Sequence, residues 1–281
     1  MELLQLNRRQ FDRFRDYIYE KSGIRVGENK LALLSNRLRR RLKGSEFEDF
    51  DSYYAHLTGS EGYTELGHFL DAITTNETSF FRTEGHFDWF KNEFVNDLVK
   101  EARDGRRPRT MRIWSAACAT GAEPYTLAVC LWENRHKLTG WALHILGTDI
   151  SEEALRAAQE GIFEPRTVEA VGERQLRRCF KPAGLENRSW QVRSQLKQFV
   201  RFERHNLMKP MHRGPFDCVF IRNVLIYFDR DSKRIVVGNL IDALAPGGFL
   251  VVGPSEGIYD ILDPLERRDS FLYRKPAESA Q

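Results

Sequence analysis

Apolar residues recur at helical spacing through the first quarter of the chain. Two stripes fall on positions three, four or seven residues apart, as on one face of an amphipathic helix. They are formed by Phe11, Phe14, Tyr17 and Ile18, and then by Leu31, Leu34, Leu38 and Leu42. A further apolar group between residues 47 and 54 begins another such pattern. The spacing predicts a small helical domain over residues 1–75.

A different pattern begins at Arg112, where short apolar runs alternate with helical segments. Strands are predicted over 112–115, 142–147, 216–221 and 249–252, and helices over 125–132, 152–160 and 229–244. This alternation is typical of a parallel α/β sheet, whose ligand site lies beyond the carboxyl ends of its strands. We therefore divide the rest of the chain into a linker over 76–90 and a sheet domain over 91–281.

One stretch interrupts this alternation, between residues 173 and 205. It contains Pro182 and Gly184 and then two short apolar runs, 192–196 and 199–202. We interpret these runs as antiparallel strands of a small β insert. The insert either closes the edge of the main sheet or offers a strand edge along which an extended peptide can pair.

Composition excludes several classes of protein. The formal net charge of +3 and the 41% of hydrophobic residues are ordinary for a folded domain. No run of 18 apolar residues and no signal-peptide pattern is present, which argues against membrane insertion and secretion. The four cysteines have neither metal-ligand nor redox spacing. We expect reduced thiols, no metal site and a cytoplasmic protein.

The small net charge conceals a strong local separation. Residues 1–43 carry a net charge of +7, whereas residues 44–75 carry −7. Arg37, Arg40 and Arg41 fall largely opposite the leucines of the second helix. Such a face is either solvated or a surface that recognises an acidic partner.

The loop after the first strand carries the strongest chemical signal. Residues 115–125 read S-A-A-C-A-T-G-A-E-P-Y, with a single glycine and no phosphate-binding Gly-Lys-Ser/Thr. Small residues let a ligand approach the backbone, and the carboxylate of Glu123 suits a cationic ligand without phosphates. S-adenosylmethionine fits that description, although a tight turn without a ligand has the same spacing. Asp149 follows the second strand, where it can bind ribose hydroxyls or simply cap a helix.

Two more clusters lie where the predicted cleft would be. Strand 216–221 delivers Arg222 and Asn223 to its carboxyl end, and Tyr227 follows four residues later. Taken singly, Asn223 is more typical of a turn and Tyr227 of a core. Arg82, on the linker, is either solvated or lines an interdomain cleft.

Three strings in register resemble the CheR family of chemotaxis receptor methyltransferases. They are T-T-N-E-T-S-F-F-R at 74–82, W-S-A-A-C-A-T-G-A-E-P-Y at 114–125 and F-I-R-N-V-L-I-Y-F at 220–228. The resemblance covers nearly the whole chain and departs at Ala122, where the family usually has Glu or Gln. It implies a Rossmann-like, S-adenosylmethionine-dependent methyltransferase sheet with an N-terminal helical domain and a small antiparallel β insert. It also implies methyl ester formation on receptor glutamates, with S-adenosylhomocysteine as the product.

The resemblance also implies roles for individual residues. Arg82 and Tyr227 would lie near the transferring methyl group, and Arg37, Arg40 and Arg41 would face the acidic methylation region of the receptor. The implied cofactor contacts are Asn76, Thr78, Arg82, Glu123, Asp149, Asn206, Leu207, Arg222 and Asn223. Some family members bind a receptor C-terminal peptide on the β insert, and this stays open here.

Two other functions compete with this hypothesis. The basic N-terminal segment also suits a nucleic-acid methyltransferase, but an acidic segment follows it and no base-methylation motif is visible. The other alternative is a signalling module that binds S-adenosylmethionine without turning it over.

Overall fold

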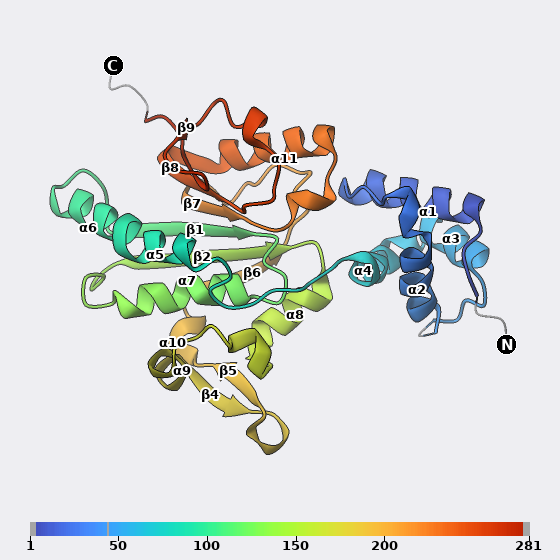
Figure 1. The fold of residues 1–281 in the computed structure, drawn as a ribbon, viewed down its shortest axis with the longest axis horizontal. Helices are drawn as coiled ribbons and strands as arrows, with labels where there is room; N and C mark the ends of the chain where they lie inside the picture. Colours follow the sequence, from blue (N-terminus) through green and yellow to red (C-terminus); the bar gives the residue numbers. More distant parts are fainter. Residues whose placement is uncertain (1–3, 44, 278–281) are drawn as a thin grey trace.

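In the computed structural model, the described residues up to 73 form a bundle of four α-helices (Figure 1). The structure describes residues 4–43 and 45–277. The helices are α1 (Arg8–Ser22), α2 (Leu31–Leu42), α3 (Phe50–Thr58) and α4 (Gly62–Ile73). Phe14 and Leu38 lie in the bundle core at 1% and 0% exposure. The predicted apolar stripes therefore meet in the core, because each helix turns its apolar face inward.

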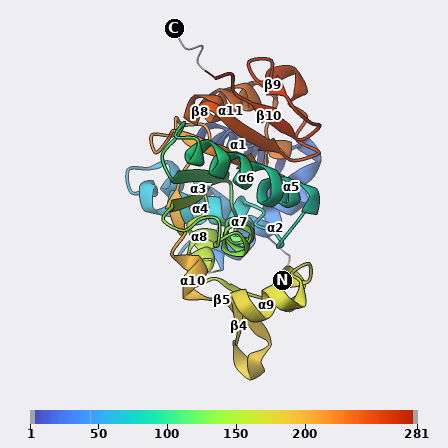
Figure 2. The same ribbon diagram turned by 90° about the vertical axis from the view of Figure 1, so that its left-hand side faces the viewer.

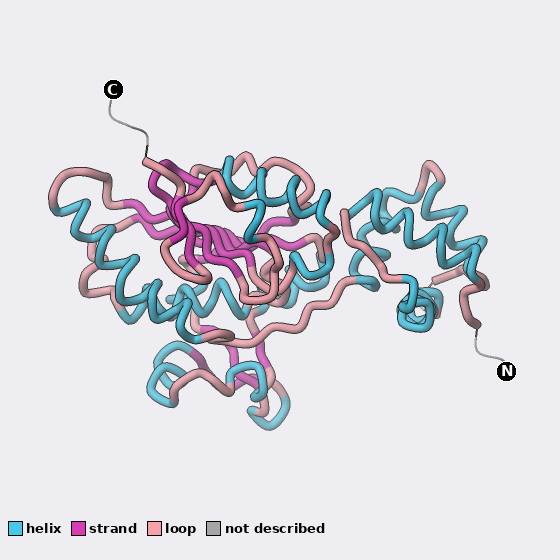
Figure 3. Tube along the Cα trace, turned by 45° about the horizontal axis from the view of Figure 1, so that its top comes forward, coloured by secondary structure: helices cyan, strands magenta, loops and turns pink. Residues whose placement is uncertain are grey.

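The connection between the two parts of the molecule is extended over residues 74–79 and runs along the sheet domain (Figure 3). Helix α5 (Glu84–Trp89) begins inside the predicted linker. It continues through a π-helical segment (Phe90–Phe94) into α6 (Val95–Arg103).

Within residues 45–277, the main sheet has seven strands in the order β6-β2-β1-β7-β8-β10-β9. The five strands from β6 to β8 run parallel to one another. Strand β10 is antiparallel to β8, and β9 is antiparallel to β10. Their bounds are β1 (Thr110–Ala116), β2 (Ala142–Asp149), β6 (Val200–Arg204), β7 (Phe216–Ile221), β8 (Leu244–Val252), β9 (Glu266–Arg267) and β10 (Leu272–Arg274). The predicted parallel α/β sheet is confirmed.

Helices cover both faces of this sheet (Figures 1 and 2). Ile113 of β1 packs toward α5, α6 and α7 (Ala122–Glu133), and its neighbour Trp114 packs toward α11 (Arg230–Ala243). This division follows from the alternation of side chains along a strand. Ser151 is the N-cap of helix α8 (Glu152–Glu160), as the sequence predicts, and its hydroxyl accepts the Ala154 N–H.

The small antiparallel sheet exists, but its strands differ from the predicted ones. It is formed by β3 (Ile162–Phe163), β5 (Ser189–Val192) and β4 (Phe180–Ala183), with α9 (Glu173–Cys179) before β4 and α10 (Ser194–Lys197) after β5. The antiparallel prediction for 199–202 is wrong, because β6 pairs in parallel with β2 at the edge of the main sheet. A short apolar run is compatible with either pairing, so the sequence alone does not identify its partner strand.

Among the described residues, no helix is both long enough and apolar enough to cross a membrane.

Candidate active site

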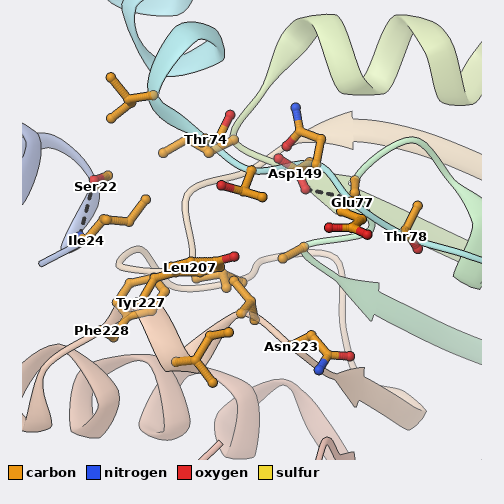
Figure 4. Close-up of a pocket in the computed structure, with 18 of the residues that line it drawn as sticks. Ser22, Ile24, Thr74, Glu77, Thr78, Asp149, Leu207, Asn223, Tyr227 and Phe228 are labelled. Atoms are coloured by element: carbon orange, nitrogen blue, oxygen red, sulfur yellow. Dashed lines mark hydrogen bonds between the residues drawn. The ribbon is translucent and has the colours of Figure 1, made fainter. Parts of the chain in front are cut away.

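A pocket of about 450 Å³ lies between the helical domain, the connecting segment and the carboxyl ends of β1, β2 and β7 (Figure 4). Figure 4 places Asp149, Thr78 and Glu77 on one side, and Leu207 and Tyr227 on another. Most of the predicted site residues line it: Arg37, Asn76, Thr78, Arg82, Glu123, Asp149, Asn206, Leu207, Arg222, Asn223 and Tyr227. Arg40 and Arg41 do not.

The loop between β1 and α7 forms one wall of the pocket. Ala117, Ala119 and Gly121 have positive φ angles of 59°, 48° and 90°. This left-handed backbone is strained for alanine, and such strain is typical of functional sites. A Cβ atom at Gly121 would lie 2.8 Å from Cβ of Ala158 on α8, so the turn needs glycine in order to pack there.

Asp149 joins this loop to the start of α8. Its Oδ2 accepts the Ala119 N–H and its Oδ1 accepts the Ser151 N–H, both over 2.9 Å. Burial raises the pKa of this carboxyl group, and the N–H donors oppose that shift. The Nδ2 of Asn76 reaches the Ser151 hydroxyl at 3.4 Å, which brings the connecting segment to the same place.

Glu123 and Arg222 form a buried ion pair beside the loop. Nη1 of Arg222 lies 2.9 Å from Oε2 of Glu123, and the side chains are 3% and 12% exposed. The Ser115 hydroxyl donates to the other carboxylate oxygen over 2.7 Å, and Nη2 of Arg222 donates to the Arg82 carbonyl. The buried Nε of Arg222 has no partner in the described part of the chain. These groups fit a zwitterionic cofactor. The carboxylate of Glu123 can accept from an ammonium group, and Arg222 offers a positive charge and an unpaired Nε–H to a carboxylate.

The helical domain closes the remaining side of the pocket. The Arg25 N–H donates to the Tyr227 carbonyl over 2.8 Å, and Ile24 forms a β-bridge with Phe228. Asn206 supports the same contact, because its Nδ2 donates to the Lys21 carbonyl over 2.8 Å. Sequence reasoning missed this segment of residues 22–27, since no motif marks it and only the tertiary contact reveals it.

The three arginines of α2 that were expected to face the receptor have different environments. Arg41 pairs with the 8%-exposed side chain of Glu65, with Nη2 at 2.5 Å from Oε2. Arg37 is half-buried and donates to the Ile73 carbonyl and, over 2.7 Å, to the Thr75 hydroxyl. Arg40 is exposed. The expected common face is therefore divided, because α3 and α4 cover part of it.

The titratable side chains that could bind a metal or act as thiols can be located in the described part of the chain. Over residues 4–43 and 45–277, no three His, Cys, Asp or Glu side chains lie together as metal ligands. All four cysteines are buried free thiols. Burial raises the pKa of Cys118, which lines the pocket, well above its ordinary value, so this thiol stays protonated.

A parallel sheet with a small-residue first loop and a carboxylate after its second strand defines a nucleotide-type cofactor site. Comparison with protein families makes this more specific. Residues 76–270 match the CheR methyltransferase, SAM binding domain, and residues 9–74 match the CheR methyltransferase, all-alpha domain. The chain belongs to the CheR methyltransferase family, and its cofactor is S-adenosylmethionine.

Curated relatives agree with this assignment. The "Chemotaxis protein methyltransferase" of Salmonella typhimurium is 32% identical over 99% of this chain and 93% of its own. "Chemotaxis protein methyltransferase 2" of Vibrio cholerae is 34% identical over 95% and 92%, and the Escherichia coli protein is 34% identical over 95% and 89%. The solved glycopeptide N-methyltransferase MtfA with S-adenosylmethionine aligns at 13% identity over 55% of this chain and 52% of its own, with a TM-score of 0.33.

Proposed function

We propose that this protein methylates glutamate side chains of chemoreceptors, forming methyl esters at the expense of S-adenosylmethionine. The relatives named chemotaxis protein methyltransferases support this proposal over a nucleic-acid methyltransferase or a non-catalytic binding module.

The observation that carries the proposal is the charge around the pocket. Five cationic side chains line it, Arg25, Lys30, Arg37, Arg82 and Arg222, against the three carboxylates of Glu77, Glu123 and Asp149. The carboxylates of Glu123 and Asp149 already accept hydrogen bonds from the protein. An anionic acceptor is therefore favoured at the mouth of the pocket.

A glutamate acceptor also explains what the residues need to do. Its pKa of about 4.3 leaves it ionised at neutral pH, so no side chain has to remove a proton. When bound, S-adenosylmethionine supplies a methyl group activated by the sulfonium. Arg82 would bind the acceptor carboxylate, and the Tyr227 hydroxyl would donate to it. The wall formed by residues 22–27 would exclude water and hold the acceptor in line.

Incorporation of labelled methyl groups tests this function. The purified chain is given a chemoreceptor cytoplasmic fragment or RNA, and label is counted on each. We expect label on the receptor alone, and at least tenfold less with Arg82→Ala. Label on RNA would overturn the acceptor assignment, and cofactor binding without transfer to either would favour the non-catalytic module. A rate near that of the wild type with Arg82→Ala would remove Arg82 from the mechanism.

Receptor recognition would involve the arginines of α2. Arg40 is exposed, and Arg37 lies at the pocket, so both can face an acidic helix next to the acceptor glutamate. Arg41 is the weakest candidate of the three because it is paired with Glu65. The proposed acceptor lies in the cytoplasmic region of receptors, and this supports a cytoplasmic location.

A receptor C-terminal peptide on the β insert stays a prediction. Strands β3 and β4 form the two edges of that small sheet, and either could pair with an extended segment. Calorimetric titration of the peptide decides the question, since absence of binding would leave the insert with a structural role.

A further inference from the structure

The loop after β7 has an unusual backbone that orients three residues of the pocket. It carries Arg222, Asn223 and Tyr227, all of which line the cavity. Asn223 has a φ angle of 58°, in the left-handed region that most residues avoid. The next residues form a single 3₁₀ turn (Leu225–Tyr227). Asparagine tolerates this region better than most residues, and contacts from outside the loop can fix the backbone in this one conformation.

A buried carboxylate holds the loop from behind. Glu256 follows β8 and is 1% exposed. Its Oε1 accepts the Asn223 N–H, and its Oε2 accepts the Leu225 N–H over 2.8 Å. Both oxygens of one side chain thus fix the backbone on either side of Val224. Hydrogen bonds to a charged acceptor are about twice as strong as neutral ones.

The surroundings of Glu256 are shaped for this contact. A Cβ atom at Gly253 would lie 2.5 Å from Oε1 of Glu256 and 3.1 Å from the Asn223 nitrogen, so the carboxylate can approach only because residue 253 is glycine. Lys233 on α11 donates its ammonium group to the Glu256 carbonyl over 2.6 Å, which anchors the backbone of the same residue.

We infer that Glu256 is a positioning residue for the methyltransferase site. Its carboxylate keeps Asn223 in the left-handed conformation and starts the turn at Leu225. Arg222, Asn223 and Tyr227 thereby face the cofactor pocket before any ligand arrives. Glu256 itself does not line the pocket, so its effect on the cofactor passes through the loop.

The test is Glu256→Gln, which preserves size but turns an NH₂ group toward a backbone N–H donor. Its matched control is Asp217→Asn at the opposite end of β7. The Asp217 carboxylate accepts the Arg112 N–H and an Arg107 guanidinium, both over 2.7 Å, far from the pocket. Calorimetry with S-adenosylhomocysteine and hydrogen exchange of amides 222–228 are measured on both variants without any acceptor. Neither measurement depends on whether the protein methylates glutamate, so the two proposals can fail independently.

We expect Glu256→Gln to weaken S-adenosylhomocysteine binding about tenfold and to speed exchange at 222–228, with neither change in Asp217→Asn. Gly253→Ala displaces the carboxylate without removing it, and should act in the same direction. Affinity within about twofold of wild type together with unchanged exchange, in Glu256→Gln or in Gly253→Ala, would overturn the inference. An equal loss of affinity in Asp217→Asn would do so as well, since it would show a general effect of destabilisation.

Discussion

Removing Arg41 should destabilise the protein, although its neighbour Arg40 on the same helix can be removed at almost no cost. The Arg41 guanidinium holds Glu65 through Nε at 2.7 Å and Nη2 at 2.5 Å, and the Tyr53 hydroxyl donates to Glu65 over 2.7 Å. In Arg41→Ala, the Glu65 carboxylate stays buried without its main counter-charge. Breaking a fully buried ion pair costs about 3–5 kcal/mol. The Arg41 side chain is 20% exposed, so water can enter, and about 2 kcal/mol is the reasonable expectation.

Thermal and urea unfolding measure this difference. A loss of about 2 kcal/mol lowers Tm by about 5 °C for a chain of this size. Arg40 is exposed, so Arg40→Ala should change the unfolding free energy by less than about 0.5 kcal/mol. Equal stability of the two variants would refute the reasoning, and so would a loss confined to Arg40→Ala.

Three further outcomes are expected. Replacing Asp149 by Asn weakens S-adenosylhomocysteine binding about tenfold by calorimetry, because one oxygen that accepts a loop N–H becomes a donor; unchanged affinity would remove Asp149 from the site. Arg40→Ala lowers receptor methylation at low ionic strength and flattens its salt dependence, whereas a wild-type slope would make Arg40 an ordinary solvated side chain. The stability difference between wild type and Arg41→Ala narrows as the pH falls below about 4.5. Burial raises the pKa of Glu65, but Arg41 and Tyr53 lower it by more, so the net pKa is below its ordinary value. The stabilisation that goes with this lowered pKa is lost when Glu65 is protonated. A difference that is independent of pH in urea unfolding would contradict this link.

The elements around the cofactor could be predicted because their signals are local. Strand 216–221 is a continuous apolar run, and β7 (Phe216–Ile221) has those bounds. Ser151 and Gly161 flank α8 as a side-chain cap and a left-handed residue, which are interactions within one turn of helix. Signals of this kind need no knowledge of the partner segments.

The features that escaped prediction depend on partners distant in the chain. The apolar run at 199–202 indicates a strand but not which strand it joins, and its Val200 pairs with Ile145 of β2, far earlier in the chain. The face of α2 could be predicted from its period, but not that Glu65 of α4 would pair with Arg41. Glu256 lies in a loop of Pro, Ser and Gly, and only the fold brings it to Asn223.

The most direct test of the central claim is the chemical identity of the methylated group. A receptor fragment labelled by this protein is treated with mild base, and the volatile product is collected. A carboxyl ester releases the label as methanol, and replacing the acceptor glutamates by Gln or Ala should abolish that release. Label that resists base, as a methylated amine would, would contradict the proposed glutamate methylation.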